Sequence, residues 1–185
     1  MGALVKSGDR QAAVELVAEE QNQYLTFLLG GEMFAIGILN IKEIIEYGSL
    51  TEVPMMPEFI RGVINLRGAV VPVVDLSARF GRKRTEVTRR TCIVIIEVET
   101  DDEKHDVGLV VDSVSEVLEI AAGEIEPAPS FGTRIRADFI HGMGKVNGKF
   151  VIILSVNNVL SLDDLAILEN AAGAEVPLLA EGASV

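Results

Sequence analysis

Short runs of apolar, mostly β-branched residues recur along the centre of the chain, separated by glycines, prolines and acidic turns. Apolar runs of about 4–8 residues bounded by such turn residues are typical of buried β-strands. Gly30-Gly31 and Asn147-Gly148 are dipeptides that favour two-residue hairpin turns. The pattern therefore predicts strands over 24–29, 32–38, 68–76, 91–99, 105–114, 115–120 and 148–156.

Helical periodicity is confined to a few short segments. Isoleucines at helical spacing predict a helix over 38–47, and 76–80 has the length of a single turn. A capping-box-like start followed by a leucine stripe predicts a closing helix over 161–170. A short helix is also expected within 1–22. The chain is therefore expected to be all-β with a C-terminal helix, arranged as compact barrels or as a sandwich.

The segment "IRGVINLRGAVVPVVD" breaks the strand pattern in three ways. Gly62 and Gly68 are expected inside strands, where glycine usually marks a bulge or a close backbone approach. Pro72 requires an edge strand or a bulge, because it has no amide hydrogen to donate. Arg61 and Arg67 interrupt apolar sequence, and each must either reach solvent or pair with a carboxylate.

One weak internal echo is present. The runs "VVPVVD" (70–75) and "VGLVVD" (107–112) both end in an aspartate after apolar residues. Two related barrel halves would produce such an echo, and so would the free recurrence of short apolar runs in β-proteins. Both interpretations stay open at this point.

The charge is strongly negative although the chain is hydrophobic. Its 185 residues carry a net charge of −12 at pH 7, and 49% of them are hydrophobic. This acidity argues against a dedicated nucleic-acid binder, because phosphate backbones favour clustered lysine and arginine. The one basic segment, 79–90, has no aromatic platform beside it and is interpreted as a solvated connection. Part of the acidity lies in residues 160–185, which carry no basic residue.

The residue inventory narrows the class of protein further. No apolar run is long enough to span a membrane, no secretory signal pattern occurs, and the single cysteine, Cys92, cannot form an internal disulfide. We therefore expect a cytoplasmic protein. No metal-ligand spacing, phosphate-binding loop or nucleophile elbow occurs, so neither a metal nor a cofactor is expected. An enzyme would have to use Asp75, Asp112 and His141, which no spacing brings together.

The segment "FIRGVINLRGAVVPVVDL" resembles the signature of the CheW family, the coupling proteins of bacterial chemotaxis arrays. Further blocks resemble the family in the same order, and several ordered blocks are more specific than one short motif. These blocks are "NIKEIIEY", "VGLVVDSVSEVLEI" with "IEPAPSF", and "FIHGMGKVNGKFVIILSVNNVL". The resemblance covers approximately residues 23–170.

The resemblance implies a fold of two five-stranded β-barrels packed around a shared hydrophobic core. The first barrel would hold approximately residues 31–83 and the second approximately 84–149, with the terminal strands crossing over to complete the opposite barrel. The N-terminal extension (1–22) and an acidic tail (171–185), expected to be flexible, would lie outside this domain.

The function that the resemblance implies is that of a non-enzymatic adaptor. Such a protein couples the cytoplasmic tip of chemoreceptors, the methyl-accepting chemotaxis proteins, to the regulatory domain of the histidine kinase CheA. The expected partners are thus two proteins, reached in the cytoplasm at the receptor arrays of the inner membrane, with no nucleic acid and no membrane insertion. An adaptor of a parallel pathway, controlling pili or a second messenger, shares these motifs and stays open. A CheW-like part joined to a receiver domain is not expected.

For the receptor, the resemblance implies an apolar groove beside a charged pair. Glu43 and Arg67 match the charged pair, and Gly62 would let a receptor helix come close, since glycine lacks a Cβ. Cys92 stands where the family usually has an aliphatic residue, and is interpreted as a small hydrophobe. A helical hairpin would lay an apolar stripe into such a groove. The remaining groove positions are Ile41, Ile44, Val114 and Val117.

For the kinase, two segments are candidates. The loop "YGSLTEVPMM" places apolar residues among turn residues, where methionine adapts well to a partner surface. In "IEPAPSF", Glu126 stands where relatives often have a basic residue, so the polarity of that contact is expected to be reversed. The candidate kinase-binding residues are Leu50, Val53, Met55, Met56, Ile125, Glu126 and Phe131.

Overall fold

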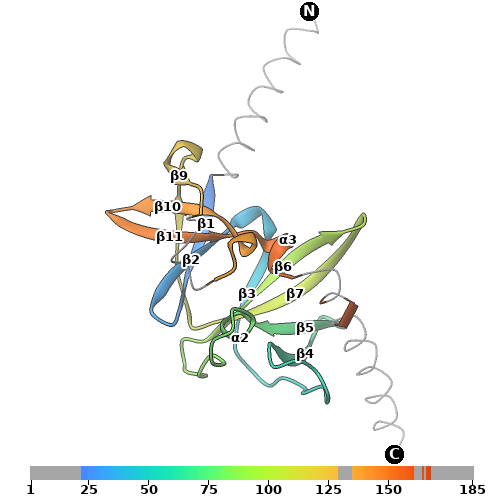
Figure 1. The fold of residues 1–185 in the computed structure, drawn as a ribbon. Coiled ribbons are helices and arrows are strands. Elements are labelled where there is room, and N and C mark those ends of the chain that lie inside the picture. Colours follow the sequence, from blue (N-terminus) through green and yellow to red (C-terminus); the bar gives the residue numbers. More distant parts are fainter. Residues whose placement is uncertain (1–21, 129–134, 161–163, 165, 168–185) are drawn as a thin grey trace, which may run out of the picture.

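A computed structural model describes residues 22–128, 135–160, 164 and 166–167, whose strands form two sheets (Figure 1). Sheet A contains, in spatial order, β8 (Ser113–Glu119), β1 (Gln23–Leu29), β2 (Glu32–Gly37), β11 (Lys149–Leu154), β10 (Ile140–Val146) and β9 (Ile125–Glu126). Sheet B contains β3 (Ile41–Glu46), β6 (Cys92–Thr100), β7 (Glu103–Val111), β5 (Ala69–Asp75) and β4 (Ile60–Leu66). Short helical turns connect them: η1 (Ile38–Asn40), α2 (Leu76–Arg79), η2 (Ala122–Glu124), η3 (Ala137–Phe139) and α3 (Val156–Val159).

Each sheet curls until its two ends meet. In sheet A the end strands β8 and β9 are joined by a connection of only five residues, which contains η2. In sheet B the chain that leaves β3 pairs with the opposite end strand, because Thr51 and Val63 exchange backbone hydrogen bonds of 3.0 and 2.9 Å. Closure of this kind removes exposed strand edges. The fold is therefore the expected pair of small barrels, with the two-residue β9 added to sheet A.

The largest apolar cluster lies between the barrels and takes residues from both sheets. Along β6, Val94 and Ile96 face this shared core, whereas Ile93 and Ile95 face the interior of sheet B, as the period of two in a strand requires. Phenylalanine rings from both parts of the chain run through the shared core in a row. The row is Phe27, Phe34, Phe80 and Phe139, with ring centroids 5.7 to 6.0 Å apart between neighbours.

The helix expected over 38–47 is wrong. A single 3-10 turn is followed by β3, which pairs with β6 from Ile41↔Ile96 to Glu46↔Cys92. Along β3 burial alternates residue by residue between intermediate and exposed. Tertiary pairing of β-branched isoleucines thus overrides the helical spacing. The hairpin turns expected at 30–31 and 147–148 are confirmed, and the single turn expected over 76–80 is α2, Leu76–Arg79.

The strands do not divide between the barrels near residue 83. β2 belongs to sheet A although it precedes that boundary, and β6 and β7 belong to sheet B although they follow it. The reason is that sheet A joins the N-terminal hairpin to the strands from β8 onward, while the chain from β3 to β7 forms sheet B between them. The crossing of terminal strands is therefore more extensive than expected.

Two glycine and proline positions also differ from expectation. Gly68 lies in the two-residue turn between β4 and β5, with φ +85°, rather than inside a strand. Pro72 lies in β5, which is an interior strand of sheet B. Its missing N–H is tolerated because the pairing of β5 with β7 begins only at Val73.

The two barrels repeat one another. β10, β11 and α3 follow β4, β5 and α2 with an offset of 80 residues, so "FIHG" at 139–142 takes the places of "FIRG" at 59–62. Both hairpins have their register shift before the glycine, and both second strands pair in parallel with a strand of the other hairpin in the same sheet. In the two sheets β3 then corresponds to β8, β6 to β1 and β7 to β2. With this correspondence the five strands of sheet B have the same spatial order as the first five strands of sheet A. The two barrels therefore have the same arrangement of strands. The similarity between 70–75 and 107–112 does not reflect this repeat, because these residues belong to β5 and β7, which are neighbours in one barrel and not equivalent strands of the two.

Several expectations fall outside the described residues. The N-terminal extension, the tail 171–185 and most of the closing helix 161–170 belong to them. The short C-terminal helix that the structure describes is α3.

Candidate partner-binding surfaces

The predicted charged pair forms. Arg67 Nη2 lies 2.6 Å from Glu43 Oε2. Arg67 occupies the first position of the β4–β5 turn with φ +52°, and Asn65 Oδ1 accepts a hydrogen bond of 3.0 Å from the Gly68 N–H that follows it. The turn thereby aims the arginine at β3. Its side chain is 79% exposed and that of Glu43 only 21%, so the pair presents a guanidinium above a half-buried carboxylate.

A small hollow lies beneath this pair at the open end of sheet B. Its volume is about 140 Å³, and its walls include Glu43, Leu66, Val71 and Ile95. Within the described residues, Glu43 Oε1 is buried and accepts no hydrogen bond. A buried carboxylate oxygen without a donor is costly, so this atom can still accept a hydrogen bond from a partner.

A cluster of alternating charges surrounds the hollow. Lys42 Nζ lies 2.8 Å from Asp106 and 3.3 Å from Glu97, and Lys104 lies 3.4 Å from Glu97. The hydrogen bonds that Lys42 donates to Asp106 and Glu97 raise its pKa, and the bond from Lys42 lowers the pKa of Glu97. These groups are solvent-accessible, so the cluster fixes the position of β3 more than it stabilises the fold.

The other face of β3 carries the predicted apolar positions. Ile41 and Ile44 pair with Ile96 and Val94, which face the shared core, so they point to that side of sheet B. Ile41 packs against the core, and Ile44 remains 43% exposed at its rim. The bulge at Lys42 separates this face from the Glu43 face.

β8 supplies the matching positions from sheet A. Val114 pairs with Phe27 and packs against the shared core, whereas Val117 pairs with Leu25 and is 53% exposed. Cys92 packs against the same core, and its Sγ donates a hydrogen bond of 3.3 Å to the Arg90 carbonyl. β3 and β8 are end strands of their sheets. We call the residues Ile41, Ile44, Cys92, Val114 and Val117 the apolar rim.

Gly62 has a different role from the one expected. A Cβ at this position would lie 2.3 Å from the Thr51 carbonyl oxygen, and its φ is +150°. The close approach that glycine permits is therefore made by the protein's own chain, where the 47–59 connection closes sheet B. Gly142 occupies the equivalent place in sheet A, under Ile125.

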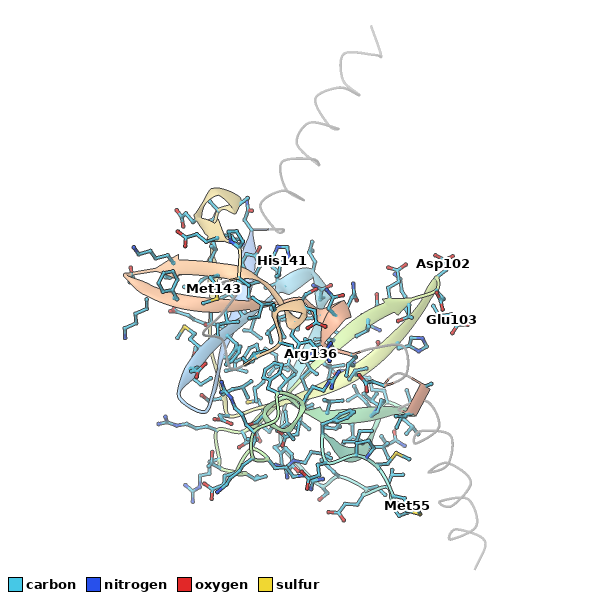
Figure 2. The ribbon with its side chains drawn as sticks, in the orientation of Figure 1. Met55, Asp102, Glu103, Arg136, His141 and Met143 are labelled. Carbon is cyan, nitrogen blue, oxygen red and sulfur yellow. The ribbon has the colours of Figure 1, made fainter. Side chains whose placement is uncertain are left out.

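The first kinase segment is only partly available to a partner. Leu50 is half-buried and packs against the interior of sheet B, and Met56 is half-buried and packs against the shared core. Val53 is half-buried. Met55 is fully exposed at φ +61°, and Figure 2 shows it at the lower edge of the molecule, pointing away from the strands.

The second kinase segment lies on sheet A. Ile125 packs against the cluster around Ile120 and Tyr24, while Glu126 is exposed and pairs with Met143. Phe131 lies outside the described residues. Since Thr51↔Val63 and Glu126↔Met143 are equivalent pairs of the two barrels, the two candidate segments occupy equivalent places.

A family model described as CheW-like domain matches residues 23–164. The chain belongs to the CheW-like family. It is 34% identical over 160 residues to the chemotaxis protein CheW of Klebsiella aerogenes, covering 86% of this chain and 92% of that one. It is 33% identical to the Bacillus subtilis chemotaxis protein CheW, covering 74% and 85% of the two chains.

A solved structure agrees with the sequence comparisons. The crystal structure of the scaffolding protein TtCheW from Thermoanaerobacter tengcongensis superposes with a TM-score of 0.69 at 34% identity, covering 78% of this chain and 90% of that one. The chain also matches chemotaxis protein CheV3 of Helicobacter pylori at 30% identity, over 77% of this chain and 45% of that one. The protein is thus a CheW-type protein with the fold of a chemotaxis scaffold.

The arginines of this CheW-like chain have separate uses. Arg61 pairs with Asp75 at 2.8 Å and also donates to the Thr85 carbonyl; the two side chains are 14% and 0% exposed. Asp75 also accepts from the Ala78 and Thr85 N–H groups, so a buried charge is fully hydrogen-bonded. Of the alternatives left open for Arg61, pairing is the one observed.

The basic segment is not simply a solvated connection. The Arg79 side chain is only 16% exposed, with its guanidinium 5.1 Å from the ring of Phe59 and 4.9 Å from the ring of Phe139, the equivalent residue of the second barrel. It donates 2.8 Å bonds to the Val159 carbonyl and to Asp164. The sequence signal for this residue was the "LSARF" turn directly after a buried aspartate. In the described part of the chain no helix is long and apolar enough to cross a membrane.

Proposed function

We propose that this CheW-type protein is a non-enzymatic adaptor in the cytoplasm, which couples the tip of chemoreceptors to the regulatory domain of the histidine kinase CheA. The observation that carries the proposal is that, in a chain of this family, the end strands β3 and β8 carry the apolar rim and β3 also carries Glu43 of the Glu43–Arg67 pair.

The rim suits a helical partner. Ile44 and Val117 are exposed although they lie on faces of β3 and β8 that elsewhere contact the core. An apolar stripe of a receptor helix would cover both side chains, and burying them would stabilise the complex by roughly 25 cal/mol per Å² of apolar surface, before the costs of association. Exposed apolar positions bordered by charge are a feature of protein-binding surfaces.

The charged pair distinguishes the sheet B side of the molecule from the equivalent place beside sheet A. In sheet A the turn residue equivalent to Arg67 is Asn147, so the hairpin there carries no cation at this position. A receptor helix with an acceptor near Arg67 and a donor near Glu43 Oε1 would therefore bind beside sheet B and not at the equivalent place beside sheet A.

For the kinase we propose the two equivalent segments, represented by Met55 and by Glu126. Each lies on the connection that follows an end strand, β3 or β8, and closes its barrel. An adaptor with two separate surfaces can hold a receptor and a kinase at once. Acidic Glu126 would then face a basic position of its partner.

Of the three residues considered for an enzyme, the two aspartates hold the backbone or a neighbouring arginine in place, and the histidine does not share a hollow with either of them. Asp75 forms an ion pair with Arg61 and accepts hydrogen bonds from two backbone N–H groups. Asp112 Oδ2 accepts a 2.8 Å hydrogen bond from the Gly30 N–H at the β1–β2 turn. His141 lines a hollow in which neither aspartate takes part. We therefore propose no catalytic step.

Two binary binding measurements test the proposal. The purified chain is sedimented with membranes that contain a chemoreceptor and with matched membranes that lack it, and a tagged regulatory domain of the kinase is used to retain the chain on a column. We expect receptor-dependent sedimentation and retention by the kinase domain. Failure of both would reject the adaptor assignment, whereas retention by the kinase domain alone would point to a different scaffold role.

A further inference from the structure

The end of sheet A beside the β1–β2 and β10–β11 turns contains a hollow of about 540 Å³ (Figure 1). We call this hollow the mouth of sheet A. Phe150 on its wall is 53% exposed, and Figure 2 shows Met143 on β10, a strand that borders it. Exposed apolar surface bordered by polar residues is a feature of protein-binding surfaces. The half-buried apolar residues of the walls are Leu28, Met33, Leu118, Met143, Val146 and Ile152.

The equivalent place in sheet B is occupied by charged side chains of the chain itself. The hollow there measures only about 140 Å³. Glu97 and Asp106 form a cross-strand pair of β6 and β7, and both bind Lys42. The corresponding cross-strand pair of β1 and β2 is Leu28 and Met33. The mouth of sheet A is therefore wide and apolar where its counterpart is narrow and internally ion-paired.

One acid is retained in the mouth of sheet A without its cation. Glu116 directly follows the bulge of β8, as Glu43 follows the bulge of β3. Glu43 binds Arg67, but the turn residue of sheet A that corresponds to Arg67 is Asn147. Glu116 is exposed, and its carboxylate forms no ion pair with another described residue. This acid is thus available to a cation from outside the chain.

A base lies across the mouth from this acid. Lys149 on β11 is exposed and likewise forms no ion pair with another described residue. In the closed order of sheet A, two strands separate β8 from β11 on either side, so Glu116 and Lys149 stand on opposite walls. The third charged residue of the walls, Glu32, binds Arg82 at 3.2 Å. The mouth therefore has one free acid and one free base on opposite sides of an apolar hollow.

We propose that two copies of this chain bind each other mouth to mouth about a twofold axis. A surface with an acid on one side and a base on the other is complementary to itself. A twofold axis in the plane of contact, perpendicular to the line that joins the two groups, places Glu116 of each copy against Lys149 of the other. Phe150 and the apolar walls then cover one another, and burial of apolar surface favours the contact.

The counterpart in sheet B does not offer this contact, because its acids and bases are already paired within the chain. The contact uses neither Glu43 nor Arg67, so both remain free for another partner. Self-association can therefore be measured without a receptor or a kinase, and its absence would leave the adaptor assignment unaffected.

Sedimentation equilibrium of the full chain over about a hundredfold range of concentration tests the proposal, because the mass of a self-associating protein rises with concentration. We expect the mass to rise from that of one chain toward that of two. Glu116→Lys and Lys149→Glu should each weaken the dimer about tenfold or more, because like charges then face each other in both contacts. Glu119→Lys, on the same strand and outside the mouth, is the control and should change the dimer by less than about twofold.

The twofold arrangement makes a sharper demand on combinations of these variants. An equal mixture of Glu116→Lys and Lys149→Glu chains should form dimers again, since opposite charges then meet in both contacts. The double variant should dimerise by itself for the same reason. A mass of one chain at every concentration would overturn the proposal, and so would a dimer that neither single variant weakens or that the mixture does not restore.

The apolar part of the contact has a control of equal exposure. Phe150 is 53% exposed in the mouth, and Leu39 is 54% exposed outside it. Phe150→Ser should weaken the dimer about tenfold or more, and Leu39→Ser should leave it within about twofold. Thermal unfolding of each variant at low concentration checks that the monomer remains folded. An equal effect of both variants would contradict the mouth-to-mouth contact.

Discussion

Arg67 at the β4–β5 turn reaches Glu43 on β3, with 2.6 Å between Nη2 and Oε2. β3 and β4 are the two end strands of the five-stranded sheet, so this ion pair links β3 to the turn that directly follows β4. The pair exists only because the turn residue adopts a left-handed backbone and the sheet is closed. Its exposed guanidinium makes it a recognition feature with little weight in stability.

Reversal of the arginine charge should therefore affect binding and leave the fold intact. We expect Arg67→Glu to weaken receptor binding about tenfold or more, because it places a like charge beside Glu43 and removes the cation that a partner would meet. Sedimentation with receptor membranes measures the loss, and thermal unfolding checks the fold. The double variant Glu43→Arg with Arg67→Glu should recover part of the binding. Normal binding by Arg67→Glu would contradict this role.

The apolar rim can be tested with a control of equal exposure. Val117 is 53% exposed on the rim, and Val87 is 52% exposed in the basic segment, which is not part of the rim. Val117→Asp should lower receptor binding at least tenfold, because a carboxylate would have to be desolvated at the contact, and Val87→Asp should leave binding within about twofold. An equal loss in both variants would show that the rim has no special part in binding.

The two arginines of the signature should differ sharply in their effect on stability. Arg61→Met leaves buried Asp75 without its cation and should lower the free energy of unfolding by about 3–5 kcal/mol. Arg67→Met removes a largely exposed pair and should cost about 0–1 kcal/mol. Urea unfolding of both variants measures the difference. Similar losses would mean that the buried pair is not the more important one for the fold.

Gly62 is predicted to be required for closure of sheet B. Gly62→Ala should destabilise the protein, because its Cβ would collide with the Thr51 carbonyl in addition to the strain of a positive φ. Gly68→Ala has a positive φ but open space, so it isolates the strain at about 1–2 kcal/mol. We expect Gly62→Ala to exceed that loss by about 1–3 kcal/mol. Equal midpoints in urea would argue against the close approach.

The Lys42 cluster sets a pH window. The pKa of Lys42 is raised above its ordinary 10.5, so its contribution is complete below that pH and is lost as pH rises through the higher folded value. The pKa of Glu97 is lowered below its ordinary 4.5, so its contribution is present above that pH and is lost as pH falls through the lower folded value. The stability difference between wild type and Lys42→Met should thus be constant between these limits and shrink outside them. A difference that changes between pH 6 and 9 would contradict this.

Hairpins and burial were predictable from the sequence because turn residues and apolar runs are local signals. The hairpin turns at Gly30-Gly31 and Asn147-Gly148 follow from such signals. The strand over 41–46 was not, since Ile41, Ile44 and Ile45 match a helical spacing and the bulge at Lys42 interrupts the alternation of a strand. Only pairing with β6 decides between helix and strand, and that pairing is not encoded near these residues.

The site was predictable only in part, for a related reason. The contact between Glu43 and Arg67 follows from the family resemblance, because residues 24 positions apart meet only after the barrel closes. The same closure packs Leu50 and Met56 against the apolar clusters and brings the Thr51 carbonyl against Gly62. None of these contacts has a signal in the nearby sequence. The 80-residue repeat of "FIRG" and "FIHG" was visible in the sequence and would have identified the two equivalent hairpins.

The most direct test of the central claim is recovery of the kinase in a three-component sedimentation assay. Receptor-containing membranes and CheA-type kinase are sedimented with no adaptor, with the wild-type chain, with Val117→Asp and with Val87→Asp. We predict that the wild-type chain and Val87→Asp increase the kinase in the pellet severalfold over the level without adaptor, and that Val117→Asp does not. Equal kinase recovery with and without the wild-type chain would contradict the adaptor function.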